Sequence, residues 1–88
     1  SLFFAPVSNL IENGEGWMIY PNPSKNNLNV SKITEKGVLE LLDMNGKILW
    51  RNEIKQNTKL NISKYKSGLY MLKFQSENYN FIETVLIN

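Results

Sequence analysis

The chain has 88 residues, which is enough for one domain with a modest hydrophobic core. It contains no cysteine and no histidine, so disulfides, Cys/His zinc sites, thiol nucleophiles and histidine general bases are excluded. The net charge is only +2 and the lysines are scattered, whereas nucleic-acid-binding domains gather basic residues on one face. No apolar stretch approaches the ~20 residues that a membrane helix needs. These features favour a small globular domain.

Residues 1–16 show no periodic pattern. Two small apolar clusters, at residues 2–4 and 10–11, stand among polar residues, and an Asn-Gly-Glu-Gly run closes the segment. Such runs favour turns and flexible links. We therefore predict a linker with one short strand over residues 1–16 and a folded domain over residues 17–88. The missing initiator methionine at Ser1 also leads us to expect a piece of a longer protein.

A Pro-Asn-Pro motif follows the first predicted strand, residues 17–20. Pro21 and Pro23 each fix φ and remove a backbone donor. Each also pushes its preceding residue, Tyr20 or Asn22, towards extended conformations. Such a stretch fits the edge of a β domain and neither a helix nor a central strand. We predict a rigid turn that leads the chain onto the domain.

Short alternating segments separated by turn residues continue to the end of the chain, at a spacing of roughly 8–12 residues. The strands predicted after the motif cover residues 27–31, 38–43, 47–52, 58–62, 70–75 and 79–87. With residues 17–20 they make about seven strands, and no helical period of useful length occurs. The pattern predicts an all-β fold, an antiparallel immunoglobulin-like β-sandwich.

The predicted core consists of apolar residues on the inner faces of these strands. They are Ile19, Leu28, Val30, Leu39, Leu41, Leu49, Leu60, Ile62, Tyr65, Tyr70, Leu72, Phe74, Val85 and Ile87. Ile33 is expected to tuck inward from the polar connection around it.

Turn residues mark two places in the predicted sandwich. Asp43 and Gly46 hold the first and fourth positions of a predicted type I turn. Gly46 is the left-handed glycine that commonly follows the two central residues of such a turn. Gly68 is expected to supply a positive φ before the strand that contains Tyr70.

Two registers compete in the hairpin of residues 38–52. A type I turn with a bulge pairs Leu42 with Ile48 and Leu41 with Leu49, and it places Trp50 on the outer face. A two-residue type I′ loop instead pairs Leu41 with Trp50 and buries the indole, because a one-residue slip exchanges the two faces. We favour the first register, since Asp43 then caps its own turn.

In the favoured register an apolar patch faces outward, made of Leu42, Ile48 and Trp50. Contiguous exposed apolar surface often marks a partner site; the alternative is that residues 2–11 fold back and cover the patch. The last strand is a second candidate, since a sheet edge can pair with a partner. Its candidate contacts are Val85, Leu86 and Ile87.

The order of these motifs resembles the C-terminal sorting domain of type IX (Por) secretion cargo, type A. The likeness rests on Tyr-Pro-Asn-Pro-Ser at 20–24, Leu-Asn-Val at 28–30, and the stretches 39–47, 60–63 and 68–72. It implies a β-sandwich at the C-terminus of a secreted protein. It further implies that the outer-membrane translocon of Gram-negative bacteria recognises this domain. In the family a surface sortase typically then removes the domain and often links the cargo to lipopolysaccharide, and the resemblance implies the same here.

The resemblance also implies roles for particular positions. Residues 1–16 occupy the place of the linker where cleavage falls. The family motif at the start of the domain falls on Tyr20, Pro21, Asn22 and Pro23, and the turn motifs fall on Asp43, Gly46, Gly68 and Tyr70. The family tail often carries lysines around its aliphatic pair, whereas residues 84–88 keep the aliphatic part and lack them. Recognition through tail charge is therefore not expected to follow the family pattern.

The resemblance thus implies a non-catalytic sorting module, not an enzyme, with no cofactor, small-molecule substrate or nucleic acid. Its partners would be the translocon, the sortase and an upstream cargo domain, and its route would run through the periplasm to the outer-membrane cell surface. Two alternatives stay open. One is a carbohydrate-binding sandwich of a secreted enzyme that stacks sugars on Trp17, Trp50 and Tyr79, and the other is a structural spacer that stays attached to its protein.

Overall fold

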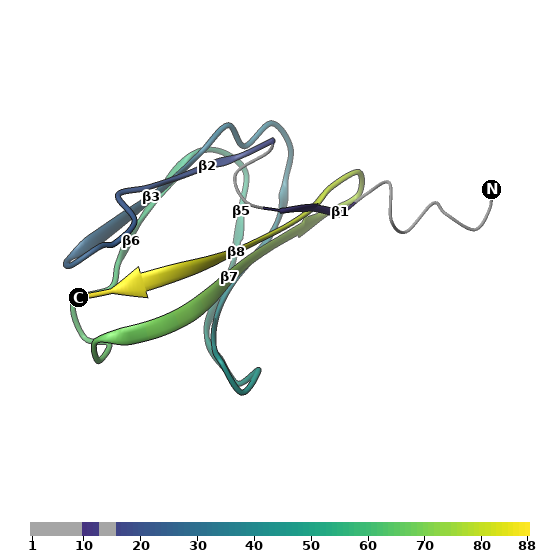
Figure 1. Ribbon diagram of the computed structural model, residues 1–88. Coiled ribbons are helices and arrows are strands. Elements are labelled where there is room, and N and C mark those ends of the chain that lie inside the picture. Colours follow the sequence, from purple (N-terminus) through teal and green to yellow (C-terminus); the bar gives the residue numbers. More distant parts are fainter. Residues whose placement is uncertain (1–9, 13–15) are drawn as a thin grey trace.

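The computed structural model describes residues 10–12 and 16–88. Eight strands form two sheets, and no described residue is helical (Figure 1). The larger sheet has the order β1-β8-β7-β4-β5 and the smaller one β2-β3-β6. All pairings between neighbouring strands are antiparallel except that of β1 with β8, which is parallel. The predicted all-β sandwich is confirmed, with β1 as an addition to its seven antiparallel strands.

The strand bounds follow the predicted segments closely. The strands are β1 (Leu10–Glu12), β2 (Met18–Tyr20), β3 (Asn27–Ser31), β4 (Gly37–Asp43), β5 (Ile48–Ile54), β6 (Thr58–Asn61), β7 (Gly68–Ser76) and β8 (Asn80–Ile87). In Figure 1, β8 runs beside β7, and β2, β3 and β6 lie together as a separate layer.

The core forms where alternating side chains of the two sheets meet. In β7, Tyr70, Leu72 and Phe74 are buried, whereas Leu69, the residue before Tyr70, is 52% exposed. Burying one such large apolar side chain contributes about 1.5–3 kcal/mol relative to leaving it in water. The alternation therefore fixes which face of β7 meets the smaller sheet.

Most of the predicted core is buried, and Ile33 tucks inward as expected. Leu49 and Tyr65 are the exceptions, since both are half-buried at the margin of the core. Three further residues belong to the core although they were not predicted there: Trp17, Ile54 and Phe81. Trp17 is fully buried, and its ring centroid lies 5.3 Å from that of Phe81.

Gly37 opens β4 at a point of close approach. A Cβ at this position would lie 2.5 Å from the Phe74 ring and 2.6 Å from the carbonyl oxygen of Gln75. The strand can therefore begin against β7 only because position 37 has no side chain.

Candidate recognition surface

The Pro-Asn-Pro motif leaves β2 and reaches the last strand, where Asn22 bonds directly to the β8 backbone. The Asn22 side-chain amide donates to the carbonyl oxygen of Thr84 at 3.1 Å, and its Oδ1 accepts from the amide of Leu86 at 3.0 Å. The peptide bonds before Pro21 and Pro23 are both cis. The two prolines and Asn22 are exposed, so the motif is fastened to β8 while its own surface faces solvent.

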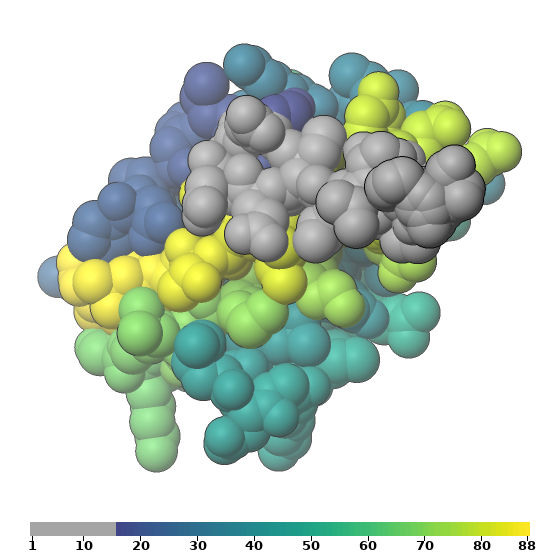
Figure 2. Space-filling view, turned by 45° about the vertical axis from the view of Figure 1, so that its right-hand side comes forward, coloured from purple at the N-terminus to yellow at the C-terminus, as the bar shows by residue number. Residues whose placement is uncertain are grey.

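Ser24 continues the same contact with its main chain. Its amide donates to the carbonyl oxygen of Leu86 at 2.9 Å, and its carbonyl oxygen accepts from the amide of Asn88 at 2.7 Å. Its hydroxyl donates to the carbonyl oxygen of Pro21, which closes the turn. Ser24 is 2% exposed, and Figure 2 shows the yellow C-terminal residues lying against the blue segment that contains it.

The outer edge of β8 is thus covered by two different segments. β1 pairs with it from Asn80 to Ile82, and Asn22 and Ser24 bond to it from Thr84 onward. An uncovered strand edge presents unpaired amides and carbonyls to other chains. The Pro-Asn-Pro motif and the last strand therefore form one surface, which the sequence did not predict.

The hairpin turn is built as predicted. Oδ1 of Asp43 accepts hydrogen bonds from the amides of Asn45 and Lys47, both at 2.9 Å. The amide of Gly46 donates to the carbonyl oxygen of Asp43 at 3.0 Å, and Gly46 has a φ of 88°. Asp43 therefore caps its own turn, and the left-handed position falls on a glycine.

The favoured register is wrong beyond the first pair of the hairpin. Leu42 pairs with Ile48 as predicted, but a bulge then shifts the ladder, so Leu41 pairs with Trp50 and not with Leu49. The bulge inserts Leu49 as an extra residue, and this returns Trp50 to the side of the core. Trp50 is half-buried and packs against the core cluster, so the predicted place of its indole on the outer face is corrected.

Apolar side chains nevertheless gather on the outer face of the larger sheet. Leu42 pairs with Ile48 on one side and with Met71 on the other, and Leu69 pairs with Leu86 in the next row. We call these five residues the outer patch. Ile48, Leu69 and Leu86 are 47%, 52% and 37% exposed, whereas Leu42 is buried. The outer patch adjoins the Asn22 contact, because the amide of Leu86 binds Asn22 Oδ1.

The remaining predicted residues lie in the core or in the second turn. Val85 and Ile87 are buried, so of the three tail candidates only Leu86 is exposed.

The second predicted turn precedes β7, and Gly68 has the expected positive φ, 153°. The Tyr70 hydroxyl donates to the carbonyl oxygen of Lys66 at 2.6 Å, the kind of bond that a tyrosine corner makes in immunoglobulin-like sandwiches. The alternative in which residues 2–11 cover the patch falls largely outside the described residues.

One carboxyl of β8 points towards the core. Glu83 pairs with the buried Leu72 of β7, and its Oε1 and the Nε1 of Trp17 are both buried without a hydrogen bond of regular geometry. Burial raises the pKa of Glu83 above its ordinary value, and the nearby Trp17 indole N–H opposes the rise in part. The opposite holds for Glu35, since hydrogen bonds from Asn78 lower its pKa.

The described residues hold no cluster of three or more His, Cys, Asp or Glu side chains that could bind a metal ion. Among the same residues no helix is long and apolar enough to cross a membrane. Trp17 is fully buried and Tyr79 packs its ring on Phe81 at 5.3 Å. Sugar stacking requires exposed aromatic rings, so Trp17 is not available for it.

The sandwich, the motif bonded to β8 and the outer patch define a small all-β domain with an exposed apolar surface beside its last strand. A family model of the secretion system C-terminal sorting domain matches residues 18–88. The chain therefore belongs to the family of type IX C-terminal sorting domains, which are sorting signals and not catalysts. Membership implies secretion to the cell surface or the extracellular space of Gram-negative bacteria. No curated protein matches the chain.

Proposed function

We propose that this domain carries an upstream cargo protein through the outer membrane by presenting its last strand, the Pro-Asn-Pro motif and the outer patch together to the translocon. The observation that carries the proposal is the hydrogen bonding of Asn22 to Thr84 and Leu86. It joins two stretches more than 60 residues apart into one surface beside exposed apolar side chains. Contiguous exposed apolar surface often marks a partner site.

The first test fuses residues 1–88 to the C-terminus of a periplasmic reporter in a bacterium with a type IX system. We expect the reporter to reach the cell surface or the medium. A reporter that accumulates in the periplasm, while a fusion to a native sorting domain of that bacterium is exported, would contradict the proposal.

A second test separates the outer patch from general stability. Ile48→Asp and Leu69→Asp place charges on exposed positions of the patch, and Met18→Asp is the matched control, since Met18 is 44% exposed on the smaller sheet. We expect export to fall for the two patch variants and to persist for the control, with all three folded by circular dichroism. Equal export of all three would remove the outer patch from the recognition surface.

We further propose that a surface sortase cuts within residues 1–16 and leaves the cargo at the cell surface. Support comes from the family match, which begins at residue 18. Mass spectrometry of the exported reporter would show a C-terminus inside residues 1–16. An exported reporter that keeps the intact domain would instead support the structural spacer.

A further inference from the structure

A groove lies between β5 and β6, the terminal strands of the two sheets. Its volume is about 350 Å³, at the lower end of the range of about 300–1,000 Å³ for ligand sites. β5 also carries Ile48 of the outer patch, but no residue of the outer patch or of the Pro-Asn-Pro motif lines the groove. The groove is therefore a second site and does not rest on the proposed secretion role.

The floor of the groove reaches the core from both layers. Leu41 comes from β4 of the larger sheet and Leu60 from β6 of the smaller one, and both are buried residues of the lining. Trp50 and Tyr65 are half-buried at the same groove. An apolar floor with two aromatic walls binds an apolar side chain well.

The charge of the lining has one sign. Lys59 and Lys64 line the groove and are exposed, and none of the lining residues is acidic. The Nζ of Lys64 lies 5.5 Å from the centre of the Tyr65 ring, which holds this cation at the rim. The positive rim favours an occupant with carboxylates.

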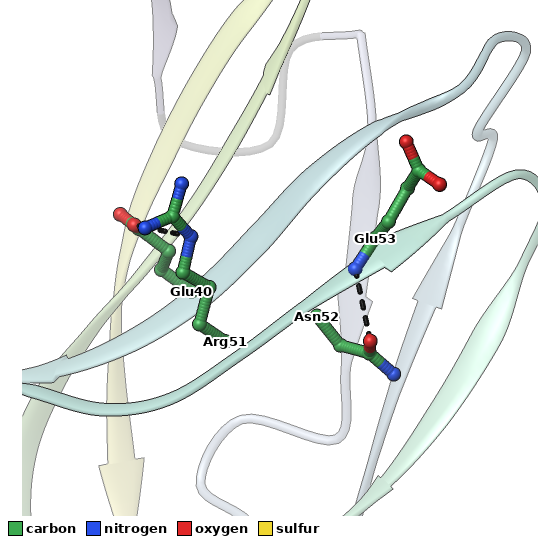
Figure 3. Close-up of polar contacts among 4 residues, drawn as sticks. All are labelled: Glu40, Arg51, Asn52 and Glu53. Atoms are coloured by element: carbon green, nitrogen blue, oxygen red, sulfur yellow. Dashed lines mark hydrogen bonds and ion pairs between the residues drawn. The ribbon is translucent and has the colours of Figure 1, made fainter.

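The strands beside the groove offer main-chain groups. Among the described strands β5 pairs only with β4, and β6 only with β3, so each has one unpaired edge. One donor of the β5 edge is already used, because Asn52 Oδ1 accepts from the amide of Glu53 at 3.1 Å (Figure 3). Arg51 points to Glu40 with Nε 3.5 Å from Oε2. Unpaired strand edges bind extended peptides through the main chain.

We propose that this groove binds an extended acidic peptide segment of a partner protein. One apolar side chain of the segment would rest on Leu41 and Leu60, and its carboxylates would meet Lys59 and Lys64. The free strand edges favour a peptide over a saccharide, since a saccharide has no backbone that matches them.

The test uses the ¹⁵N-labelled 88-residue chain and an acetylated hexapeptide that alternates glutamate and leucine. We expect the peptide to shift the Trp50 indole N–H and the amides of Lys59 and Asn61 in NMR spectra, without moving the β8 amides. The double variant Lys59→Glu/Lys64→Glu should weaken binding about tenfold, because two rim contacts are reversed in sign.

The matched control Lys25→Glu/Lys36→Glu makes the same charge change at exposed positions away from the groove lining. It should bind as the unchanged chain does. If the double groove variant loses its NMR dispersion, Lys59→Gln/Lys64→Gln replaces it and should weaken binding to a smaller extent.

Three results would overturn the proposal. One is that a lysine–leucine hexapeptide gives the same shifts as the acidic one. Another is that millimolar acidic peptide moves no groove resonance, and the third is that only a cello-oligosaccharide moves the Trp50 indole, which would assign the groove to sugars.

Discussion

Asn22 behaves at the level of a single side chain as a short piece of β-strand. Its side-chain amide donates to the carbonyl oxygen of Thr84 and accepts from the amide of Leu86, as the main chain of a neighbouring strand would. Proline on either side has no amide to compete for these partners. The Asn22 side chain thus pairs with the outer edge of β8 beyond the part that β1 occupies.

We predict that Asn22→Ala lowers the free energy of unfolding by about 1–2 kcal/mol, since two hydrogen bonds to β8 are lost at an exposed site. The thermal midpoint should fall by several degrees. The control is Asn26→Ala, at an exposed asparagine with no side-chain hydrogen bond among those described. Equal midpoints of the two variants would contradict the contact between the motif and the last strand.

Gly37 gives a second prediction at this scale. Gly37→Ala should destabilise the fold by about 2–3 kcal/mol, because its Cβ would overlap the Phe74 ring and the Gln75 carbonyl. Gly46→Ala should cost only about 1 kcal/mol, since no atom lies within 4 Å and the penalty comes from the positive φ alone. Chemical denaturation of both variants would measure the order, and a larger loss at Gly46 would refute it.

At the scale of elements, the hairpin shows which part of the fold the sequence could determine. The strands and the turn followed from alternation and from the Asp43–Gly46 spacing, because both are local in the chain. The bulge at Leu49 depends on what lies opposite, since Trp50 gains a place against the core that no local pattern encodes. The cover of β8 by Asn22 was equally hidden, because its partners are more than 60 residues away.

β8 also carries a carboxyl whose ionisation opposes folding. The pKa of Glu83 is raised from about 4.5 by burial, so the folded state binds the proton more tightly than the unfolded state. Stability is therefore lost as the pH rises from 4.5 through the raised pKa. Glu35 has the opposite sign, since its lowered pKa makes its contribution disappear as the pH falls below 4.5.

We predict that Glu83→Gln raises the thermal midpoint at neutral pH and that the gain shrinks to nothing in acid, where Glu83 is protonated in both states. The contribution of Glu35 is common to both proteins and cancels in the difference. Calorimetric scans of the two proteins between about pH 4 and pH 8 would measure this. A gain that is the same at every pH would assign the effect to packing and not to the charge.

At the scale of the whole molecule, the linker and the domain are not separate bodies. The predicted linker contains β1, and β1 pairs with β8 from Asn80 to Ile82. The sequence predicted one short strand there, but it could not assign a partner, since three residues carry no periodicity that identifies one. The burial of Trp17 could not be predicted either, because the short segment after the glycine-rich run carries no pattern that identifies its partner. In the structure Trp17 packs against Phe81 at the core.

We predict that residues 17–88 fold without the linker but expose one part of the β8 edge. Amide hydrogen exchange should become faster for residues 80–82, which lose β1, and should stay slow at Leu86 and Asn88, which keep their bonds to residues 22–24. Uniform acceleration along β8 would contradict the division of its edge into two separately covered parts.

The parallel pairing of β1 with β8 would change what the proposed cleavage accomplishes. A cut after Glu12 in the linker would sever the chain, yet it would leave the last residues of the cargo paired with the domain that has been cut away. Separation would then need a second event, in which a three-residue strand leaves its neighbour. The cargo would stay bound to the domain after the cut and would be released only when the three-residue pairing opens.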